Sequence, residues 1–274
     1  MRRARDGVLL AVGTLTRIPV RPHTVDRRAA GMAMSVAPLV GLLLAALIGV
    51  PMSALSWALE VPGRPLASLL VSMLAVTALA WITRGLHLDG LADLADALGS
   101  NRPPEQALAI ARQPDIGPFG TMALVLVLVV QAVALGVAID TGGGTMALAT
   151  ALVASRLALT WACIPHWPAA RADGLGAMVA QSTRVSVAGG VTAALILIGG
   201  LSGWLLTSSA FGAMLVPAGV GSSLLAGWLM LRLARRRLGG ITGDVLGASV
   251  EMAFAASVVA MALMLSFEQA HLAG

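Results

Sequence analysis

Long apolar stretches separated by short polar segments follow one another from residue 29 to the end of the chain. About 20 apolar residues are needed for a helix to cross a bilayer, and each stretch can supply one crossing. The expected spans are residues 29–59, 66–83, 116–139 and 145–164, two spans in the uncharged stretch between Arg184 and Arg232 that turn near 207–212, and a last span that begins near Asp244. The pattern therefore predicts an all-α, polytopic membrane helical bundle of about seven transmembrane spans, forming a single integral-membrane domain over residues 1–274.

Two further segments are expected to be helical without crossing the membrane. Residues 1–28 hold a short apolar run among several arginines, which is typical of an interfacial helix, here ending at Pro19. Residues 84–100 read RGLHLDGLADLADALGS, which predicts an acidic helix on the cytoplasmic side. Residues 101–113 are polar enough to lie in water.

Composition supports a membrane protein. Hydrophobic residues make up 58% of the chain, charged residues only 11%, and the mean hydropathy is +0.88. The net charge of +5 raises the question of nucleic acid, but the positive charge consists of arginines scattered through short loops. The positive-inside rule explains that distribution better than a nucleic-acid groove does, so we expect the lipid bilayer and no nucleic acid as a partner.

The arginines also predict the topology. Seven spans place the two ends of the chain on opposite sides, and every arginine except Arg64 and Arg156 then falls on the N-terminal side. By the positive-inside rule that side is the cytoplasm. The chain is therefore expected in the cell (inner) membrane as a multi-pass protein. Asp89, Asp93, Asp96, Asp115, Asp173 and Asp244 then fall on the cytoplasmic side, and Glu60, Asp140 and Glu268 outside, so any site that these aspartates form faces the cytoplasm.

The acidic segment carries the first candidate site. Asp89, Asp93 and Asp96 are spaced i, i+4 and i+7, so on a helix they project from one face. Hard oxygen ligands at that spacing suit Mg²⁺, which commonly bridges carboxylates and substrate phosphates. A merely solvated polar face would show the same spacing, which alone does not separate the two. His87 beside the acids is either a general base or phosphate ligand, or a structural histidine.

A second acidic pair lies near the C-terminus. Asp244 and Glu251 are seven residues apart, which places them on one helix face with Glu251 roughly 10 Å deeper in the membrane. A carboxylate at that depth is costly unless it meets a cation, a metal or a cavity; the alternative is a glutamate that is protonated or hydrogen-bonded across helices. Arg156 is the natural opposite charge, for a carboxylate or for a bound phosphate.

Two glycine-containing loops are weaker candidates. LGGITGD at 238–244 could present free N–H groups to an anion, or it is a turn with Thr242 or Asp244 as the helix N-cap. RADGLG at 171–176 is a flexible loop with one arginine, Arg171, that can bind phosphate.

Taken together, these segments resemble a known family. LTRIPV at 15–20, HLDGLADLAD at 87–96, IGPFG at 116–120, Ser155-Arg156, RADGLG at 171–176 and LGGITGDVLGASVE at 238–251 occur in the order and spacing of the cobalamin synthase family, also called adenosylcobinamide-GDP ribazoletransferase. The resemblance covers nearly the whole chain, and HLDGLAD and GGxTGDxLGAxxE are its specific motifs. Two departures are that Ala97 follows the acidic run where the family continues with glycine, and that Gln113-Pro114 stands where the family often has Asp-Ser.

The resemblance implies a Mg²⁺-dependent transfer that joins adenosylcobinamide-GDP to α-ribazole, or to its 5′-phosphate, and releases GMP. The product is adenosylcobalamin or its 5′-phosphate, at a late step of cobalamin biosynthesis. The expected metal ligands are Asp89, Asp93, Asp96, Asp244 and Glu251, with Asp89, Asp93 or His87 in a catalytic role. The expected substrate-binding residues are Arg17, Arg112, Ser155, Arg156, Arg171, Gly240, Thr242 and Gly243.

Two other classes of membrane protein share parts of this pattern. CDP-alcohol phosphotransferases also place Asp-Gly on membrane helices, but their pattern continues DG-x-x-AR, whereas Leu91-Ala92-Asp93 follows Gly90 here. An ion-coupled transporter would use Glu251 and Arg156 in an ion pathway, but the chain shows no internal repeat. The sequence leaves open whether the chain forms a homo-oligomer, how many Mg²⁺ ions bind, which carboxylate is the base, and whether phosphorylated α-ribazole is preferred.

Overall fold

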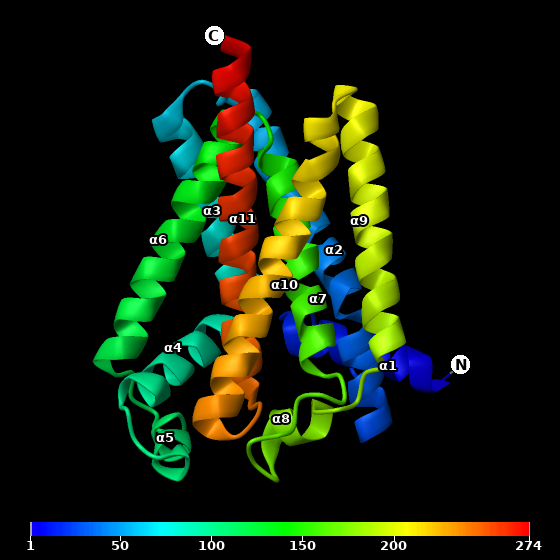
Figure 1. Cartoon of the computed structure of the whole chain (residues 1–274), viewed down its shortest axis with the longest axis vertical. Helices are drawn as coiled ribbons and strands as arrows, with labels where there is room; N and C mark the ends of the chain where they lie inside the picture. The colour runs from blue at the N-terminus through cyan, green and yellow to red at the C-terminus, as the bar shows by residue number, and fades with distance from the viewer. Residues whose placement is uncertain (1, 274) are drawn as a thin grey trace.

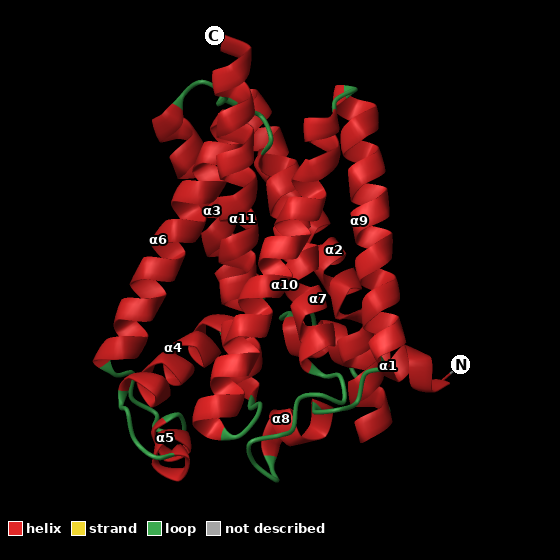
Figure 2. Cartoon of the chain, in the orientation of Figure 1, coloured by secondary structure: helices red, strands yellow, loops and turns green. Residues whose placement is uncertain are grey.

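The computed structural model describes residues 2–273, and within this part of the chain helices joined by loops make up the fold, with no strand (Figures 1 and 2). The helices are α1 (Arg2–Leu15), α2 (Arg27–Ala58), α3 (Pro65–Ile82), α4 (Leu86–Gly99), α5 (Pro104–Ile110), α6 (Pro118–Asp140), α7 (Gly144–Ala162), α8 (Gly174–Val179), α9 (Val185–Thr207), α10 (Ala210–Leu238) and α11 (Gly243–Ala273). Within residues 2–273 the one extended pairing is an isolated bridge between Ala169 and Ile241.

Seven of these helices are long and apolar enough to cross a membrane: α2, α3, α6, α7, α9, α10 and α11. They match the seven predicted stretches to within a few residues, which confirms the all-α bundle. Helix α7 continues unbroken through Ser155 and Arg156, although the apolar pattern is interrupted there. Helix α1 ends at Leu15, before the predicted Pro19, and its interfacial position stays a prediction.

Local chemistry explains several helix ends. Pro65 and Pro118 occupy the first positions of α3 and α6, where a missing N–H costs nothing. Gly239 ends α10 with a φ of +86°, a left-handed conformation that favours glycine. The hydroxyl of Thr242 then accepts a hydrogen bond from the Val245 N–H at 3.2 Å and caps α11, which confirms the N-cap interpretation of Thr242.

The core is organised around α7, the most buried of the seven spanning helices. Leu148, Leu152 and Leu159 of this helix are at most 2% exposed. Helix α9 is the least buried and packs mainly on α10 at one side of the bundle (Figure 1).

The two ends of the bundle differ in what they collect. Helices α4, α5 and α8 and the start of α11 gather at one end, near α1 (Figure 1). The α2–α3, α6–α7 and α9–α10 turns and the C-terminal end of α11 lie at the other (Figure 1). Because the number of crossings is odd, the chain begins near one end and finishes at the other, and HLDGLAD meets GGITGD at the first.

Candidate functional site

Helices α4 and α11 approach each other through glycines. A Cβ atom added to Gly90 would lie 2.9 Å from the carbonyl oxygen and 3.0 Å from the Cα of Asp244. On the other side of the contact, a Cβ at Gly247 would lie 3.2 Å from the Cα of His87. Only residues without a side chain allow backbones to come so close. The glycines of the two specific motifs therefore press the acidic helix against the start of α11.

A cavity of about 280 Å³ opens where these helices meet. It is lined by His87, Asp89, Gly90, Arg171, Gly243, Asp244 and Gly247, together with Thr14, Leu15, Met34, Leu86, Leu159, Leu175 and Leu246. Four segments far apart in sequence, namely LTRIPV with its flank, HLDGLAD, RADGLG and GGITGD, thus contribute to one space. The predicted residues His87, Asp89, Arg171, Asp244 and Gly243 are brought together in it.

Arg171 and Asp244 form the charged wall of the cavity. Arg171 Nη2 lies 3.3 Å from Asp244 Oδ2, and the Thr242 hydroxyl donates to the same oxygen at 3.1 Å. The other terminal nitrogen of Arg171, Nη1, is buried and has no partner among the described residues. A guanidinium with an unused donor beside a cavity is suited to binding a phosphate oxygen.

Asp93 belongs to a group of mutually repelling acids. Partial burial and the neighbouring charges of Asp89, Asp244 and Asp96 raise the pKa of Asp93 to about 6. Within the described part of the chain, however, no three His, Cys, Asp or Glu side chains stand close enough to hold a metal ion alone. Mg²⁺ commonly binds through one or two carboxylates, waters and substrate phosphates, and this open set of oxygen donors fits that mode better than a protein cage.

His87 lines the same cavity in a neutral form. It is 3% exposed, and neither ring nitrogen has a partner among the described residues. Burial, and then the charge of Arg156, lower the pKa of His87 to about 3. At neutral pH the ring thus keeps one N–H donor and one acceptor nitrogen that no described residue uses.

Asp96 has a partner that the sequence did not reveal. Its carboxylate accepts the backbone N–H groups of Gly117 at 2.7 Å and Gly120 at 2.9 Å, at the first turn of α6. This contact joins HLDGLADLAD to IGPFG and satisfies N–H groups that a helix start leaves free. Asp96 does not line the cavity, and its predicted metal ligation stays a prediction.

Glu251 lies deeper in the bundle and is 7% exposed. Its carboxylate accepts a hydrogen bond of 2.7 Å from Gln131 Nε2 of α6, which is the cross-helix bond of the alternative interpretation. Its role as a metal ligand stays a prediction. Gln131 was not among the residues predicted from the sequence. A polar amide within the otherwise apolar stretch 116–139 is the feature that could have indicated it.

Arg156 is buried near the same level. Its Nη1 donates to Ser155 Oγ at 3.0 Å, and its Nε has no partner among the described residues. The charge of Arg156 acts on both Glu251 and His87, yet in the described part of the chain it makes no ion pair within 4.0 Å. Arg156 and Ser155 do not line the cavity.

The remaining predicted binders are engaged elsewhere. Both oxygens of Asp173 accept from Arg112 Nη2 at 2.8 Å in an exposed ion pair. The Arg17 guanidinium lies 3.8 Å above the ring of Trp81. Gly240 packs so tightly on the backbone of Pro168 that a Cβ there would lie 2.2 Å from its carbonyl oxygen. These residues shape the loops around the cavity and do not line it.

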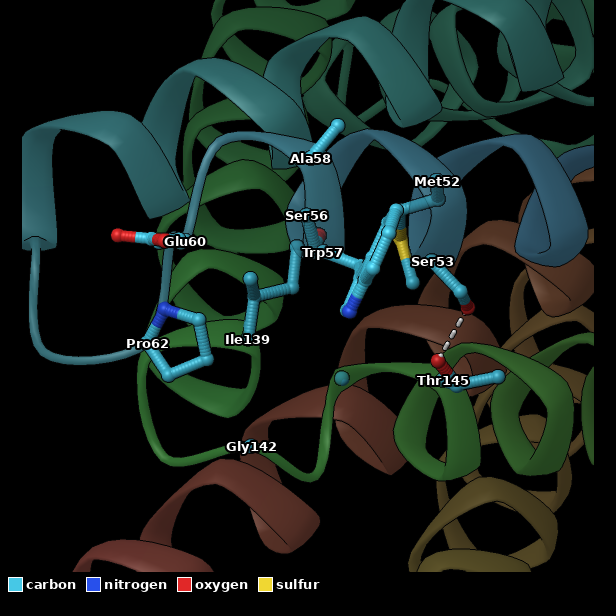
Figure 3. Close-up of a pocket in the computed structure, with 11 residues that line it drawn as sticks. Met52, Ser53, Ser56, Trp57, Ala58, Glu60, Pro62, Ile139, Gly142 and Thr145 are labelled. Atoms are coloured by element: carbon cyan, nitrogen blue, oxygen red, sulfur yellow. Dashed lines mark hydrogen bonds between the residues drawn. The ribbon is translucent and has the colours of Figure 1, made fainter.

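A larger hollow, of about 540 Å³, lies at the opposite end of the bundle (Figure 3). Its wall is formed by the end of α2, the α2–α3 turn and the start of α7, where Ser53 Oγ and Thr145 Oγ1 are 2.6 Å apart (Figure 3). Glu60 is the one ionisable residue among those lining it, and no arginine does. The larger volume therefore does not identify this hollow as the site, because a phosphate is best bound by positively charged donors and no arginine lines it.

Comparisons with known proteins agree with the motifs. The family model described as "Cobalamin-5-phosphate synthase" matches residues 7–262. A Frankia casuarinae protein named "Adenosylcobinamide-GDP ribazoletransferase" is 40% identical, covering 95% of each chain. Proteins of the same name from a Nocardioides species and from Pseudomonas paraeruginosa are 44% identical over 94% of this chain and 99% of the relative, and 38% identical over 96% and 100%. No solved structure matches. The chain belongs to the cobalamin-5-phosphate synthase family.

Proposed function

We propose that this chain is an adenosylcobinamide-GDP ribazoletransferase whose active site is the cavity between α4 and α11, facing the cytoplasm. The observation that carries the proposal is the convergence of the two most specific family motifs on one cavity, where an unused arginine donor lies beside the carboxylates of Asp89 and Asp244. Asp93 is close enough for both carboxylates to act on its pKa. The names of the relatives supply the reaction.

In this reaction an oxygen of α-ribazole forms a bond to the β-phosphorus of adenosylcobinamide-GDP. The bond from that phosphorus to the GMP oxygen breaks, GMP leaves, and the hydroxyl proton passes to a base. If the acceptor is α-ribazole 5′-phosphate, its 5′-phosphate survives in the product. The attacking atom is then a ribose hydroxyl other than the 5′ oxygen.

The chain's residues divide these tasks. Arg171, through its free Nη1, binds a diphosphate oxygen and stabilises the charge that develops there. Asp89, with Asp93 or Asp244, would hold Mg²⁺, which when bound offsets the negative charge of the diphosphate. A pKa of about 6 makes Asp93 a stronger proton acceptor than an ordinary aspartate, whereas a pKa of about 3 leaves His87 a weak base. We therefore assign His87 the role of an N–H donor and Asp93 the role of the base that accepts the hydroxyl proton.

The test is a turnover assay on the detergent-solubilised protein. Adenosylcobinamide-GDP is supplied with α-ribazole or with its 5′-phosphate, and GMP and the corrinoid product are separated by chromatography. We expect GMP release that stops with EDTA and returns with Mg²⁺. Folded protein that releases no GMP with either acceptor would contradict the proposal, and CMP release from a CDP-alcohol would favour the rejected alternative.

The cytoplasmic orientation has its own test. In a Cys163→Ala background, single cysteines replace the exposed Arg102 or Arg236 at the site end, or Gly143 at the opposite end. A membrane-impermeant thiol reagent should label Gly143→Cys in intact spheroplasts, and the other two only after lysis. Labelling of Arg236→Cys from outside would reverse the orientation.

A further inference from the structure

Another hollow lies between α7 and α10, apart from the two described above. Helices α9 and α10 meet at the turn after Thr207 and diverge toward the site end, with α7 lying behind them (Figure 1). Near the middle of the bundle the space is filled, because Ala154 and Leu157 of α7 pack on Val220 of α10. Farther toward the site end the packing opens into a crevice of about 360 Å³.

The wall of this crevice is almost entirely apolar. Ala158, Trp161 and Ile164 form one side of it, and Leu224, Trp228 and Leu231 of α10 form the other. At Gly227 the two helices come close, since a Cβ there would lie 3.0 Å from the Cβ of Ala158. An apolar crevice on a spanning helix faces acyl chains rather than water.

A basic rim adjoins the crevice at its outer end. A hollow of about 550 Å³ shares His166, Trp167 and Trp228 with the crevice and adds Arg232, Arg235 and Arg236. The spacing of Trp228, Arg232, Arg235 and Arg236 along α10 puts them on one side of the helix. We call Arg232, Arg235 and Arg236 the basic rim.

Neighbouring side chains hold two arginines of the basic rim in place, but no carboxylate neutralises their charge. Arg235 Nη1 lies 3.1 Å from His166 Nε2, and the Arg232 guanidinium lies 5.0 Å from the centre of the Trp228 ring. The residues lining the two hollows include no Asp or Glu, and within the described part of the chain none of the three arginines forms an ion pair. Three exposed cations without a counter-charge leave a site for an anion.

We propose that the crevice and its basic rim bind an anionic glycerophospholipid. The phosphate lies on the basic rim, and an acyl chain enters the crevice. Roughly 16 Å of helix separates Arg235 from Leu224, so charge and apolar wall are ordered as head group and chain are in a bilayer leaflet. Tryptophans mark the interface level, and basic pockets between membrane helices on the cytoplasmic side recognise such lipids. A free phosphate would leave the apolar wall unused, and a neutral lipid would leave the arginines unused.

Native mass spectrometry of the purified protein in neutral detergent tests this. Dioleoyl phosphatidylglycerol, dioleoyl phosphatidylcholine and inorganic phosphate are the probes, and only the first is expected to stay bound. Each arginine near a bilayer surface contributes about a fivefold factor in affinity. The variant Arg232→Gln/Arg235→Gln/Arg236→Gln should therefore weaken phosphatidylglycerol binding by about 100-fold. Arg5→Gln/Arg21→Gln/Arg102→Gln, which removes the same charge from exposed positions outside both hollows, should bind like the parent.

A second variant distinguishes the contribution of the acyl chain to binding from that of the head group. Leu224→Trp fills the crevice and keeps the basic rim, so it should weaken phosphatidylglycerol by about tenfold through lost chain burial. If the triple variant does not fold, Arg235→Gln alone should show the single fivefold loss. Equal binding of phosphatidylcholine, displacement of the lipid by millimolar inorganic phosphate, an unchanged triple variant, or a lipid-free dimer that buries the crevice would each overturn the proposal. Lipid retention is measured without turnover, so the result stands apart from that of the proposed function.

Discussion

Asp89 and Asp93 of α4 resemble the acids of α11 in sequence and differ from them in their surroundings. Asp89 and Asp93 of α4 make no hydrogen bond or ion pair through their side chains within the described part of the chain. On α11, Asp244 is held by Arg171 and Thr242, and Glu251 by Gln131. Carboxylates without protein partners are free to bind a cation and a substrate. The satisfied carboxylates instead hold α11 in place opposite α4. We therefore expect α4 to carry the chemistry and α11 to position it.

The largest expected effect is on α4. Asp93→Asn should lower GMP release by at least about 100-fold, because losing a metal ligand or base costs several kcal/mol of transition-state stabilisation. Membrane protein level and thermal midpoint should stay near the parent values. Asp115→Asn, which changes an exposed carboxylate at the same end, is the matched control. Loss of protein together with activity would instead give Asp93 a structural role.

The contact between the two helices comes next. Gly90→Ala places a Cβ 2.9 Å from the Asp244 carbonyl, so α4 must move away from α11, and we expect a loss of about 1–3 kcal/mol of stability with a fall in turnover. Gly189→Ala in α9, where a Cβ meets nothing within 4 Å, should be neutral or stabilising. Thermal unfolding in detergent measures both. Equal behaviour of the two variants would mean that the close crossing is not needed.

A substitution of Asp96 should show how the loss of a structural acid differs from the loss of a catalytic one. Asp96→Ala leaves the N–H groups of Gly117 and Gly120 without their charged acceptor, at a cost of about 1–3 kcal/mol. We expect a lower thermal midpoint and a smaller loss of turnover per folded molecule than in Asp93→Asn. A loss of Mg²⁺-dependent turnover without a change in stability would restore Asp96 to the metal site.

Gln131 extends the comparison into the membrane. Gln131→Leu removes the donor to Glu251 and leaves a buried carboxylate unpaired, which should cost about 1–3 kcal/mol of stability. The double variant Gln131→Leu/Glu251→Leu should recover part of that loss, because the carboxylate left without its donor is removed as well. Thermal midpoints of the four proteins form the cycle, and purely additive losses would show that the two side chains do not interact.

The smallest expected effect is a pH dependence. The pKa of Asp93 is about 6, so the carboxylate is mostly ionised at pH 7 and mostly protonated at pH 5. Because a metal ligand must be deprotonated, the apparent affinity for Mg²⁺ should fall about tenfold across that interval. The pKa of His87, about 3, keeps it neutral throughout, so it does not add to the change. The Mg²⁺-induced shift in thermal midpoint reports the affinity, and it should lose this pH dependence in Asp93→Asn.

Much of the architecture follows from the sequence alone. Every spanning helix was predicted within a few residues, because the cost of leaving backbone polar groups unpaired in lipid forces each apolar stretch into a helix. The i, i+4, i+7 spacing put the α4 acids on one face, and the order of motifs pointed to the family before any geometry was known. These are local or pairwise properties that the chain carries wherever it folds.

Tertiary structure alone decided which acids are free. Asp96 and Asp93 look equivalent on the helix, but the first turn of α6 supplies two N–H groups to one of them and none to the other. Glu251 gained Gln131 as a partner from a helix 120 positions away in sequence, and Arg171 kept one nitrogen unused because Asp244 reaches only the other. A side chain's role depends on which donors and acceptors lie within about 3 Å of it. In a bundle that distance is set by how helices cross, and here the crossings were fixed by backbone contacts at glycines such as Gly90 and Gly247.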